Sequence, residues 1–279
     1  MSDVSSRVAG VIVDFHAGAA LAECIDSLRQ NGVKQVVVVE NGEVGSTPPA
    51  LDGRDVVLVE PHQNLGYGRG VNRGAAHTGE FEFLLVSNPD VVVHEHAVAQ
   101  MVKYLDEHPD VAVVGPQIKR PDASVYPSQR VFPNLWLAAL HALLAPVWPS
   151  NPATKAYRSP RSDGTVDWVS GACFLIRRNV FEEIGGFDER YFMFAEDMAL
   201  CWQVREHGYG VGACSDAVVT HIEGLSRSRA SREMLIAHHQ SALRFEWQTA
   251  RGLRRVLAPL ASLVLGLRLV LVLVIRPKG

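Results

Sequence analysis

The sequence predicts an α/β fold, in which a mainly parallel β-sheet is flanked by helices on both faces. Several short runs are apolar without interruption, as in strands that are buried on both faces. Stretches with helical spacing separate these runs, and such alternation is typical of parallel sheets. With 279 residues, 47% of them hydrophobic, the chain is long enough to bury a large core.

The predicted strands of the first half lie at residues 8–13, 35–39, 56–59, 81–87 and 111–114. The first predicted helix, residues 19–31, has Leu21, Ile25 and Leu28 on one side and ends at Gly32. A second helix is expected at residues 67–77. The region 121–164 is rich in proline and aromatic residues, with a strongly apolar piece at 135–148. Strand and helix signals then return from Val166 to about Trp247.

Ligands of such sheets bind beyond the carboxyl ends of the strands. This rule selects three segments that directly follow predicted strands: Asp14-Phe15-His16, Glu40-Asn41-Gly42 and Ser87-Asn88-Pro89-Asp90. The carboxylate of Asp90 is suited to hold Mg²⁺ or Mn²⁺, which prefer oxygen ligands. A simple turn is the alternative, because Asn, Pro and Asp all favour turns.

A glycine-rich segment runs from Asn64 to Gly74 and includes Gly66, Tyr67, Gly68 and Asn72. Its spacing is G-x-G-x-G and it does not directly follow a strand, which argues against a dinucleotide fingerprint. We expect a loop that enters a helix and lets the backbone approach a nucleotide diphosphate. The alternative is a glycine-rich turn without a ligand.

His221 follows a strand-like run at residues 217–220 and precedes a loop that holds Arg227 and Arg229. An imidazole there is suited to complete a metal site, and the two arginines to grip phosphates. A structural histidine is the alternative.

Glu196 and Asp197 follow an aromatic run and precede a helix-like pattern at residues 198–204. Adjacent residues of a helix do not face the same way, so the two acids cannot share one role. Aromatic neighbours exclude water and keep a carboxylate basic enough to accept a proton. Acids at a helix N-terminus, favoured by the backbone dipole, are the alternative interpretation.

Composition excludes some classes of protein. The net charge of −3 argues against nucleic-acid binding through bulk positive charge. The four cysteines form no Cys-x-x-Cys pair and are expected to be buried thiols in a reducing compartment. The N-terminus has no apolar signal core, so the body of the protein is expected in the cytoplasm.

Residues 256–275 are almost entirely apolar and would span about 30 Å as a helix. A charge such as Arg268 within a membrane-spanning helix costs about 3 kcal/mol, so we prefer a helix that lies in the membrane interface. Arg254 and Arg268 would then share one polar edge, and cationic flanks would face anionic headgroups. A buried core helix is the alternative.

The chain resembles the family 2 glycosyltransferases from about Val8 to about Trp247. Six motifs in the same order carry the resemblance: Asn64-Leu65-Gly66-Tyr67-Gly68, Asn88-Pro89-Asp90, Ser170-Gly171-Ala172-Cys173, Gly185-Gly186-Phe187-Asp188-Glu189, Glu196-Asp197 and His221. The resemblance implies the GT-A fold and inverting sugar transfer. It divides the chain into a glycosyltransferase domain, 1–250, and a membrane-associating tail, 251–279. Within the domain, the nucleotide-sugar half lies at about 1–120 and the acceptor half at about 121–250.

A narrower resemblance is to the actinobacterial rhamnosyltransferases of cell-wall linker assembly, carried by residues 122–130, 145–152 and 156–158. It implies dTDP-L-rhamnose as donor and N-acetylglucosaminyl-diphospho-polyprenol as acceptor. It also implies a peripheral enzyme on the cytoplasmic face of the inner membrane. A homodimer is left open.

The family resemblance also implies roles for individual residues. Asp197 is similar to the catalytic base, with Glu196 as second choice. Asp90 resembles the last carboxylate of the D-x-D motif, which binds Mg²⁺ or Mn²⁺ together with His221. The expected nucleotide-sugar contacts are Asp14, His16, Glu40, Asn41, Asn64, Gly66, Tyr67, Gly68, Asn72, Asn88, Asp90, Arg227 and Arg229. The expected acceptor contacts are Arg130, Trp168, Gly171 and Glu196.

Three departures from the family pattern concern the donor. Glu40 stands where an Asp usually touches the nucleobase, residues 41–47 lack the second Asp of the family, and Asp14-Phe15-His16 stands where a Thr-Tyr-Asn-like sequence is usual. Asn88 stands where many members have an acid, as it does in the rhamnosyltransferase subgroup. Two alternatives therefore stay open. One is a family 2 transferase with another donor or acceptor in O-antigen or exopolysaccharide synthesis, and the other is an inactive protein that binds carbohydrate or lipid.

Overall fold

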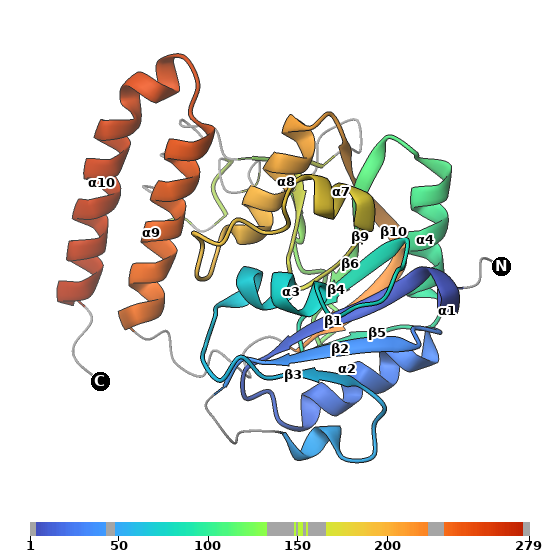
Figure 1. Ribbon diagram of the computed structural model, residues 1–279. Coiled ribbons are helices and arrows are strands. Elements are labelled where there is room, and N and C mark those ends of the chain that lie inside the picture. The colour runs from blue at the N-terminus through green and yellow to red at the C-terminus, as the bar shows by residue number, and fades with distance from the viewer. Residues whose placement is uncertain are drawn as a thin grey trace.

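The computed structural model describes residues 4–42, 48–132, 148, 150–152, 155, 166–222 and 232–275. Within them, eight strands form one sheet in the order β3-β2-β1-β4-β9-β6-β10-β5, and helices flank it (Figure 1). Strands β1, β2, β3 and β4 pair in parallel, as do β6 and β10. The predicted α/β fold with a mainly parallel sheet is therefore confirmed.

The described strands, in chain order, are β1 (Val8–Asp14), β2 (Gln35–Glu40), β3 (Val57–Val59), β4 (Phe83–Ser87), β5 (Val91–Val93), β6 (Val111–Lys119), β7 (Gln129–Arg130), β8 (Trp168–Val169), β9 (Cys173–Arg177) and β10 (Gly210–His221). The described helices are α1 (Val4–Arg7), α2 (Ala19–Gln30), the 3₁₀ helix η1 (Pro49–Leu51), α3 (Tyr67–Ala75), α4 (Ala97–Glu107), α7 (Arg178–Glu183), α8 (Glu196–Glu206), α9 (Arg232–Thr249) and α10 (Leu253–Ile275). Each predicted strand and helix of the first half is present, with ends that differ by a few residues. The apolar piece at 135–148 lies outside the described residues, apart from Trp148.

Successive residues of each strand point to opposite faces of the sheet, which divides the core in two. On one face Val8 and Ile12 of β1 pack with the apolar sides of α2 and α4. On the other face Val11 and Val13 pack with α3, α7 and α8. Because β1, β2 and β4 are parallel, their carboxyl ends lie at the same edge of the sheet.

Two strands run against the parallel direction. Strand β9 lies antiparallel between β4 and β6, and β5 pairs antiparallel with the end of β10. The chain reverses at Asn88-Pro89-Asp90, so the turn expected there is present and leads directly into β5. The all-parallel arrangement suggested by the first half thus ends at β4.

The four cysteines, Cys24, Cys173, Cys201 and Cys214, are all free and buried, as the sequence predicts. Burial raises the pKa of each thiol, so none is poised for thiolate chemistry.

Helices α9 and α10 form a hairpin beside the sheet (Figure 1). One side of α10 contacts α9, where Ala258 is buried and the hydroxyl of Ser262 accepts a hydrogen bond from the Trp247 indole at 2.9 Å. Its other side exposes a stripe of large apolar residues: Leu253, Val256, Leu260, Leu263, Val264, Leu267 and Val270. The alternative of a buried core helix is therefore wrong. In the part of the chain that the structure describes, we find no helix with both the length and the apolar character needed to cross a bilayer.

The arginines that precede this stripe are engaged within the protein. Arg254 pairs with Glu246 of α9 at 2.6 Å, and Arg251 with Glu206 of α8 at 3.1 Å. The guanidinium of Arg255 lies 5.0 Å from the centre of the Trp247 ring. The expected polar edge facing lipid headgroups is therefore not formed by Arg254, whose charge is balanced inside the hairpin.

Helix α3 lies close to the sheet because glycines at Gly70 and Gly74 face β1. A Cβ atom at Gly70 would lie 2.8 Å from Val13 Cγ1, and one at Gly74 only 2.6 Å from Val11 Cγ1. Both distances are shorter than real Cβ contacts, so any side chain at these positions would push α3 away from β1.

We therefore expect Gly74→Ala to destabilise the protein by about 1–3 kcal/mol through overpacking, although Gly→Ala within a helix normally stabilises by about 0.5–1 kcal/mol. Gly266→Ala is the matched control, because a Cβ there meets no atom within 4 Å. Urea unfolding of the two variants should give shifts of opposite sign. Equal stability of Gly74→Ala and the wild type would show that α3 tolerates more distance from the sheet.

Candidate functional site

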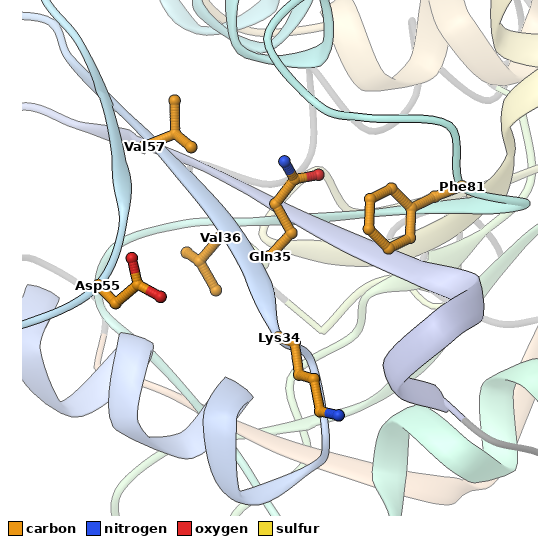
Figure 2. Close-up of a pocket in the computed structure, with 6 residues that line it drawn as sticks. All are labelled: Lys34, Gln35, Val36, Asp55, Val57 and Phe81. Carbon is orange, nitrogen blue, oxygen red and sulfur yellow. The ribbon is translucent and has the colours of Figure 1, made fainter.

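The carboxyl ends of the parallel strands assemble a set of buried polar residues. Asp14 ends β1, Glu40 ends β2 and Ser87 ends β4, and all three are buried. This is the edge at which the fold predicts a ligand. Figure 2 shows a different hollow, whose lining includes Lys34, Gln35 and Val57 near the starts of β2 and β3. It lies at the opposite ends of the strands and holds none of the predicted site residues.

Asp90 and His221 meet beside this edge, as predicted. Asp90 directly precedes β5, His221 is the last residue of β10, and the antiparallel register places His221 opposite Val91. His221 Nε2 lies 3.0 Å from Asp90 Oδ1 and 3.4 Å from the Asn88 amide nitrogen. His221 thus forms one polar cluster with Asn88 and Asp90, which lie 131 or more positions earlier in the chain.

The cluster is suited to a divalent cation that is shared with a bound phosphate. The described residues contain no group of three or more His, Cys, Asp or Glu side chains placed to hold a metal. Mg²⁺, however, is commonly held by one or two protein carboxylates together with water and substrate phosphates. Asp90 is 6% exposed, and His221 Nδ1 is buried without a hydrogen-bond partner among the described residues. A donor set of one carboxylate and one imidazole fits such an ion.

Asp197 and Glu196 form the first turn of α8, so the helix-terminus interpretation and a catalytic role are compatible. Asp197 accepts hydrogen bonds from the N–H groups of Gly171 on Oδ2 and Met198 on Oδ1, both at 2.8 Å. Burial raises the pKa of Asp197, and these two donors together with the charge of Arg130 oppose the rise. The carboxyl therefore keeps the elevated basicity that proton removal requires.

Tyr67 is coupled to this carboxyl. Its hydroxyl donates to the Gly171 carbonyl at 2.6 Å, and the N–H of the same Gly171 donates to Asp197. Burial raises the pKa of Tyr67 well above its usual value, so the phenol remains a donor. Sequence reasoning placed Tyr67 at the nucleotide, whereas the structure places its hydroxyl at the backbone that holds Asp197.

Gly66 allows the loop before α8 to pack on the start of α3. The Tyr67 N–H donates to the Phe192 carbonyl at 3.1 Å. A Cβ at Gly66, where φ is +81°, would lie 2.1 Å from that same oxygen. The contact between Phe192 and the start of α3 was not predicted from the sequence. The one feature of the sequence that indicates it is Gly66, which faces Phe192.

Arg130 and Trp168, two of the expected acceptor contacts, lie against each other near Asp197. The Arg130 guanidinium lies 5.1 Å from the centre of the Trp168 ring and donates to the Pro127 carbonyl. Cation–π contact and this hydrogen bond hold the positive charge near the carboxyl of Asp197. The structure thus brings Arg130, Trp168, Gly171 and Glu196 together around one carboxyl.

Two amides predicted to bind the nucleotide, those of Asn41 and Asn72, make hydrogen bonds within the protein. Asn41 donates to Asn64 Oδ1 and to the Gly66 carbonyl, both at 3.1 Å. Asn72 exchanges two hydrogen bonds with the backbone of Phe187, and Gly68 packs against the same side chain. These contacts fix the glycine-rich loop, while His16 is exposed beyond β1. Arg227 and Arg229 lie outside the described residues.

The chain belongs to a known enzyme family. Residues 6–237 match the family described as "Glycosyltransferase like family 2". A relative from Mycobacterium tuberculosis, N-acetylglucosaminyl-diphospho-decaprenol L-rhamnosyltransferase, is 37% identical over 88% of this chain and 84% of its own length. The O-antigen chain rhamnosyltransferase RfbN of Salmonella typhimurium is 24% identical over 77% of this chain and 66% of its own. The chain is therefore a family 2 glycosyltransferase, as the motifs predict.

Solved structures show the same fold. The mannosyltransferase PcManGT from Pyrobaculum calidifontis, in complex with GDP-Man and Mn²⁺, matches 94% of this chain and 69% of its own with a TM-score of 0.59 and 17% identity. GalNAc-T7 with UDP, GalNAc and Mn²⁺ matches 77% of this chain and 43% of its own with a TM-score of 0.56 and 13% identity. Both are similar in fold only.

The link from Tyr67 through Gly171 to Asp197 predicts the effect of Tyr67→Phe. The Gly171 carbonyl would lose its donor, at a cost of about 1–3 kcal/mol in stability. Gly171 would then hold Asp197 less firmly, and the acidic limb of kcat/KM should move to higher pH, because the Gly171 N–H lowers the pKa of that carboxyl.

The control is Tyr209→Phe, which removes a hydroxyl that bonds Glu183 at 3.1 Å, away from Asp197. It should leave the pH profile unchanged. An unmoved acidic limb in Tyr67→Phe would show that Tyr67 does not position the carboxyl.

Proposed function

We propose that this glycosyltransferase moves L-rhamnose from dTDP-L-rhamnose to N-acetylglucosaminyl-diphospho-polyprenol with inversion at the anomeric carbon. The observation that carries the proposal is the similarity to the M. tuberculosis rhamnosyltransferase, which spans 88% of this chain. The geometry supports it, because a basic carboxyl and a cation-binding pair converge near the carboxyl ends of the parallel strands.

Asp197 is proposed to accept the proton of the acceptor hydroxyl. Each of its oxygens already accepts one N–H bond, and each has a second lone pair available for the hydroxyl. As the proton leaves, the acceptor oxygen attacks the anomeric carbon opposite the bond to the nucleotide diphosphate, and that bond breaks. A β-L-rhamnosyl donor therefore gives an α-L-rhamnosyl product, without a covalent intermediate.

Asp90 and His221 are proposed to hold Mg²⁺ or Mn²⁺, with Asn88 beside them. When bound, such an ion would neutralise the charge that develops on the departing diphosphate. Arg130 adds a fixed positive charge on the acceptor side, where the diphosphate of a prenyl-linked acceptor requires a counter-charge.

A second candidate function is transfer within O-antigen assembly. The similarity to RfbN supports it, at 24% identity and lower coverage. The two candidates differ in acceptor, and the acceptor is what the decisive experiment varies.

The experiment incubates the full-length protein with dTDP-L-rhamnose and a short-chain prenyl-diphospho-N-acetylglucosamine, and identifies the product by mass. We expect one added deoxyhexose and loss of turnover in EDTA, restored by Mg²⁺ or Mn²⁺. Other donor nucleotides and O-antigen-type lipid acceptors form parallel arms. Turnover only with one of these would overturn the proposed substrates, and full activity in EDTA would overturn the proposed ion.

The assignment of the base predicts that Asp197→Asn lowers kcat by about 10²–10⁴-fold with little change in donor affinity. Glu196→Gln should lower it less. Because burial raises the pKa of Asp197, wild-type activity should fall as pH drops through that raised value, where the base becomes protonated. The pH–rate profile and both variants measure this. A greater loss in Glu196→Gln would assign the base to Glu196.

We further propose a catalytic domain at 1–250 and a peripheral membrane contact through residues 251–279, on the cytoplasmic face where the lipid-linked acceptor lies. The apolar stripe on α10 supports this contact, because burial of exposed leucine and valine in the interface stabilises binding by about 25 cal/mol per Å². Since Arg251 and Arg254 are paired within the protein, apolar area is expected to contribute more than charge.

The double variant Leu260→Glu/Leu267→Glu should move the protein from sedimented anionic vesicles to the supernatant, because both side chains are exposed and charge opposes insertion. Val125→Glu, at an exposed valine elsewhere, is the matched control and should still sediment. Activity on a short-chain acceptor should survive in both variants. Sedimentation of the double variant like that of the wild type would exclude α10 as the main contact.

A further inference from the structure

Asp14 and Glu40 form a pair of buried acids that face each other across β1 and β2. Their Cα positions are partners in the parallel register, so both side chains point to the same face of the sheet. Asp14 is 0% exposed and Glu40 is 3% exposed. If both carboxylates were ionised, their burial side by side would cost more free energy than the fold can offset.

Backbone N–H groups donate hydrogen bonds to both acids. The Ala17 N–H donates to Asp14 Oδ1 at 3.2 Å, and the Gly42 N–H donates to Glu40 Oε1 at 2.8 Å. The second oxygen of Asp14, Oδ2, is buried and receives no N–H or O–H donor from the described residues. A proton held against Glu40 would satisfy that oxygen.

The electrostatics agree with this geometry. Burial, the negative charge of Glu40 and a hydrogen bond with Glu40 together raise the pKa of Asp14 to about 7. Among the described residues, the Cys24 thiol of α2 lies near enough to sense the charges of Asp14 and Asp90, and burial keeps this thiol protonated, while His16 follows Asp14 by two residues and is exposed. Among the described residues that pack here, β4 contributes only the neutral Ser87 hydroxyl.

We propose that Asp14 and Glu40 hold one proton between them, and that this shared proton sets the charge beneath the nucleotide subsite. With the proton in place, the pair carries one negative charge, and a nucleoside diphosphate binds above it. Without the proton, the pair carries two negative charges, which repel the diphosphate and each other. The location of the nucleotide rests on the proposed function, whereas the shared proton does not.

The first measurement is the pH dependence of thermal unfolding without nucleotide. A carboxyl whose pKa is raised by folding binds more protons in the folded than in the unfolded state, so wild-type stability should fall as pH rises from 5.5 through about 7. Asp14→Asn carries a permanent donor toward Glu40 and should lack this fall. Its Tm should therefore match or exceed that of the wild type, by a margin that grows up to about pH 7.5.

Two further variants keep the test decisive. Glu40→Gln should weaken the same pH dependence, because it removes the charge of Glu40 while the burial of Asp14 remains, and it serves if Asp14→Asn fails to fold. Asp52→Asn removes an exposed carboxyl and should retain the wild-type profile. Parallel profiles for the wild type, Asp14→Asn and Glu40→Gln between pH 5.5 and 8.5 would overturn the shared proton.

The second measurement is the affinity for thymidine diphosphate by calorimetry over the same pH range. Between pH 6 and 8.5 the affinity of the wild type should fall about tenfold more than that of Asp14→Asn. This corresponds to a difference of about one unit in the pKa of the acid pair between the free and the nucleotide-bound protein. The titration of the phosphate itself is common to both proteins and cancels. Diverging Tm profiles with parallel affinity profiles would overturn the link to the nucleotide. Absence of binding at any pH would count against the proposed function, and the thermal profiles would still decide the shared proton.

Discussion

The close approach of α3 to the sheet is the constraint on which the site depends. Glycines on the inner side of α3 let it lie against β1, and Gly66 at its start lets the loop before α8 reach the Tyr67 N–H. From this position the Tyr67 hydroxyl reaches Gly171, which in turn holds Asp197. A helix displaced outward by about 1 Å would stretch this 2.6 Å hydrogen bond beyond its normal range and leave the buried Gly171 carbonyl without its donor. The Asp197 carboxyl is thus positioned by this packing as well as by the N–H of its sequence neighbour Met198.

Acidic groups are concentrated at this edge, and each is balanced by different means. Asp197 has two N–H donors and a nearby guanidinium, Asp90 has an imidazole, and Asp14 has a second acid. Backbone dipoles stabilise a charge without titrating, whereas an imidazole or a shared proton responds to pH and to ligands. The donors to Asp197 therefore do not titrate themselves, although the carboxyl that they hold does.

Much of the fold followed from the sequence because the strands are buried on both faces and read as unbroken apolar runs. The three-residue strand β5 and the four-residue helix α1 are too short to show any periodicity. At the site, residue type and position after a strand single out Asp90 and His221, whereas Asp197 is singled out by its place between an aromatic run and a helix and by the family resemblance. The acceptor of the Tyr67 hydroxyl could not be predicted from the sequence. Gly171 lies 104 residues away, and it accepts through a backbone carbonyl, which every residue has. The pairing of Arg254 with Glu246 escaped prediction for the same reason, since it depends on how α9 and α10 cross.

Strand β10 has an irregular portion and a regularly paired portion. The two differ in how well they accommodate an inserted or deleted residue. Between Cys214 and Val218 its register with β6 jumps, so residues 215–217 pair with neither neighbouring strand. From Val219 onward the strand pairs continuously with β5, up to His221. An inserted or deleted residue at 215–217 is absorbed by the bulge. The same change between 219 and 221 would turn the imidazole to the opposite face of the sheet, away from Asp90. Among homologous chains, indels in this strand are therefore expected to accumulate in the bulge and to be absent from the three residues that follow Val218.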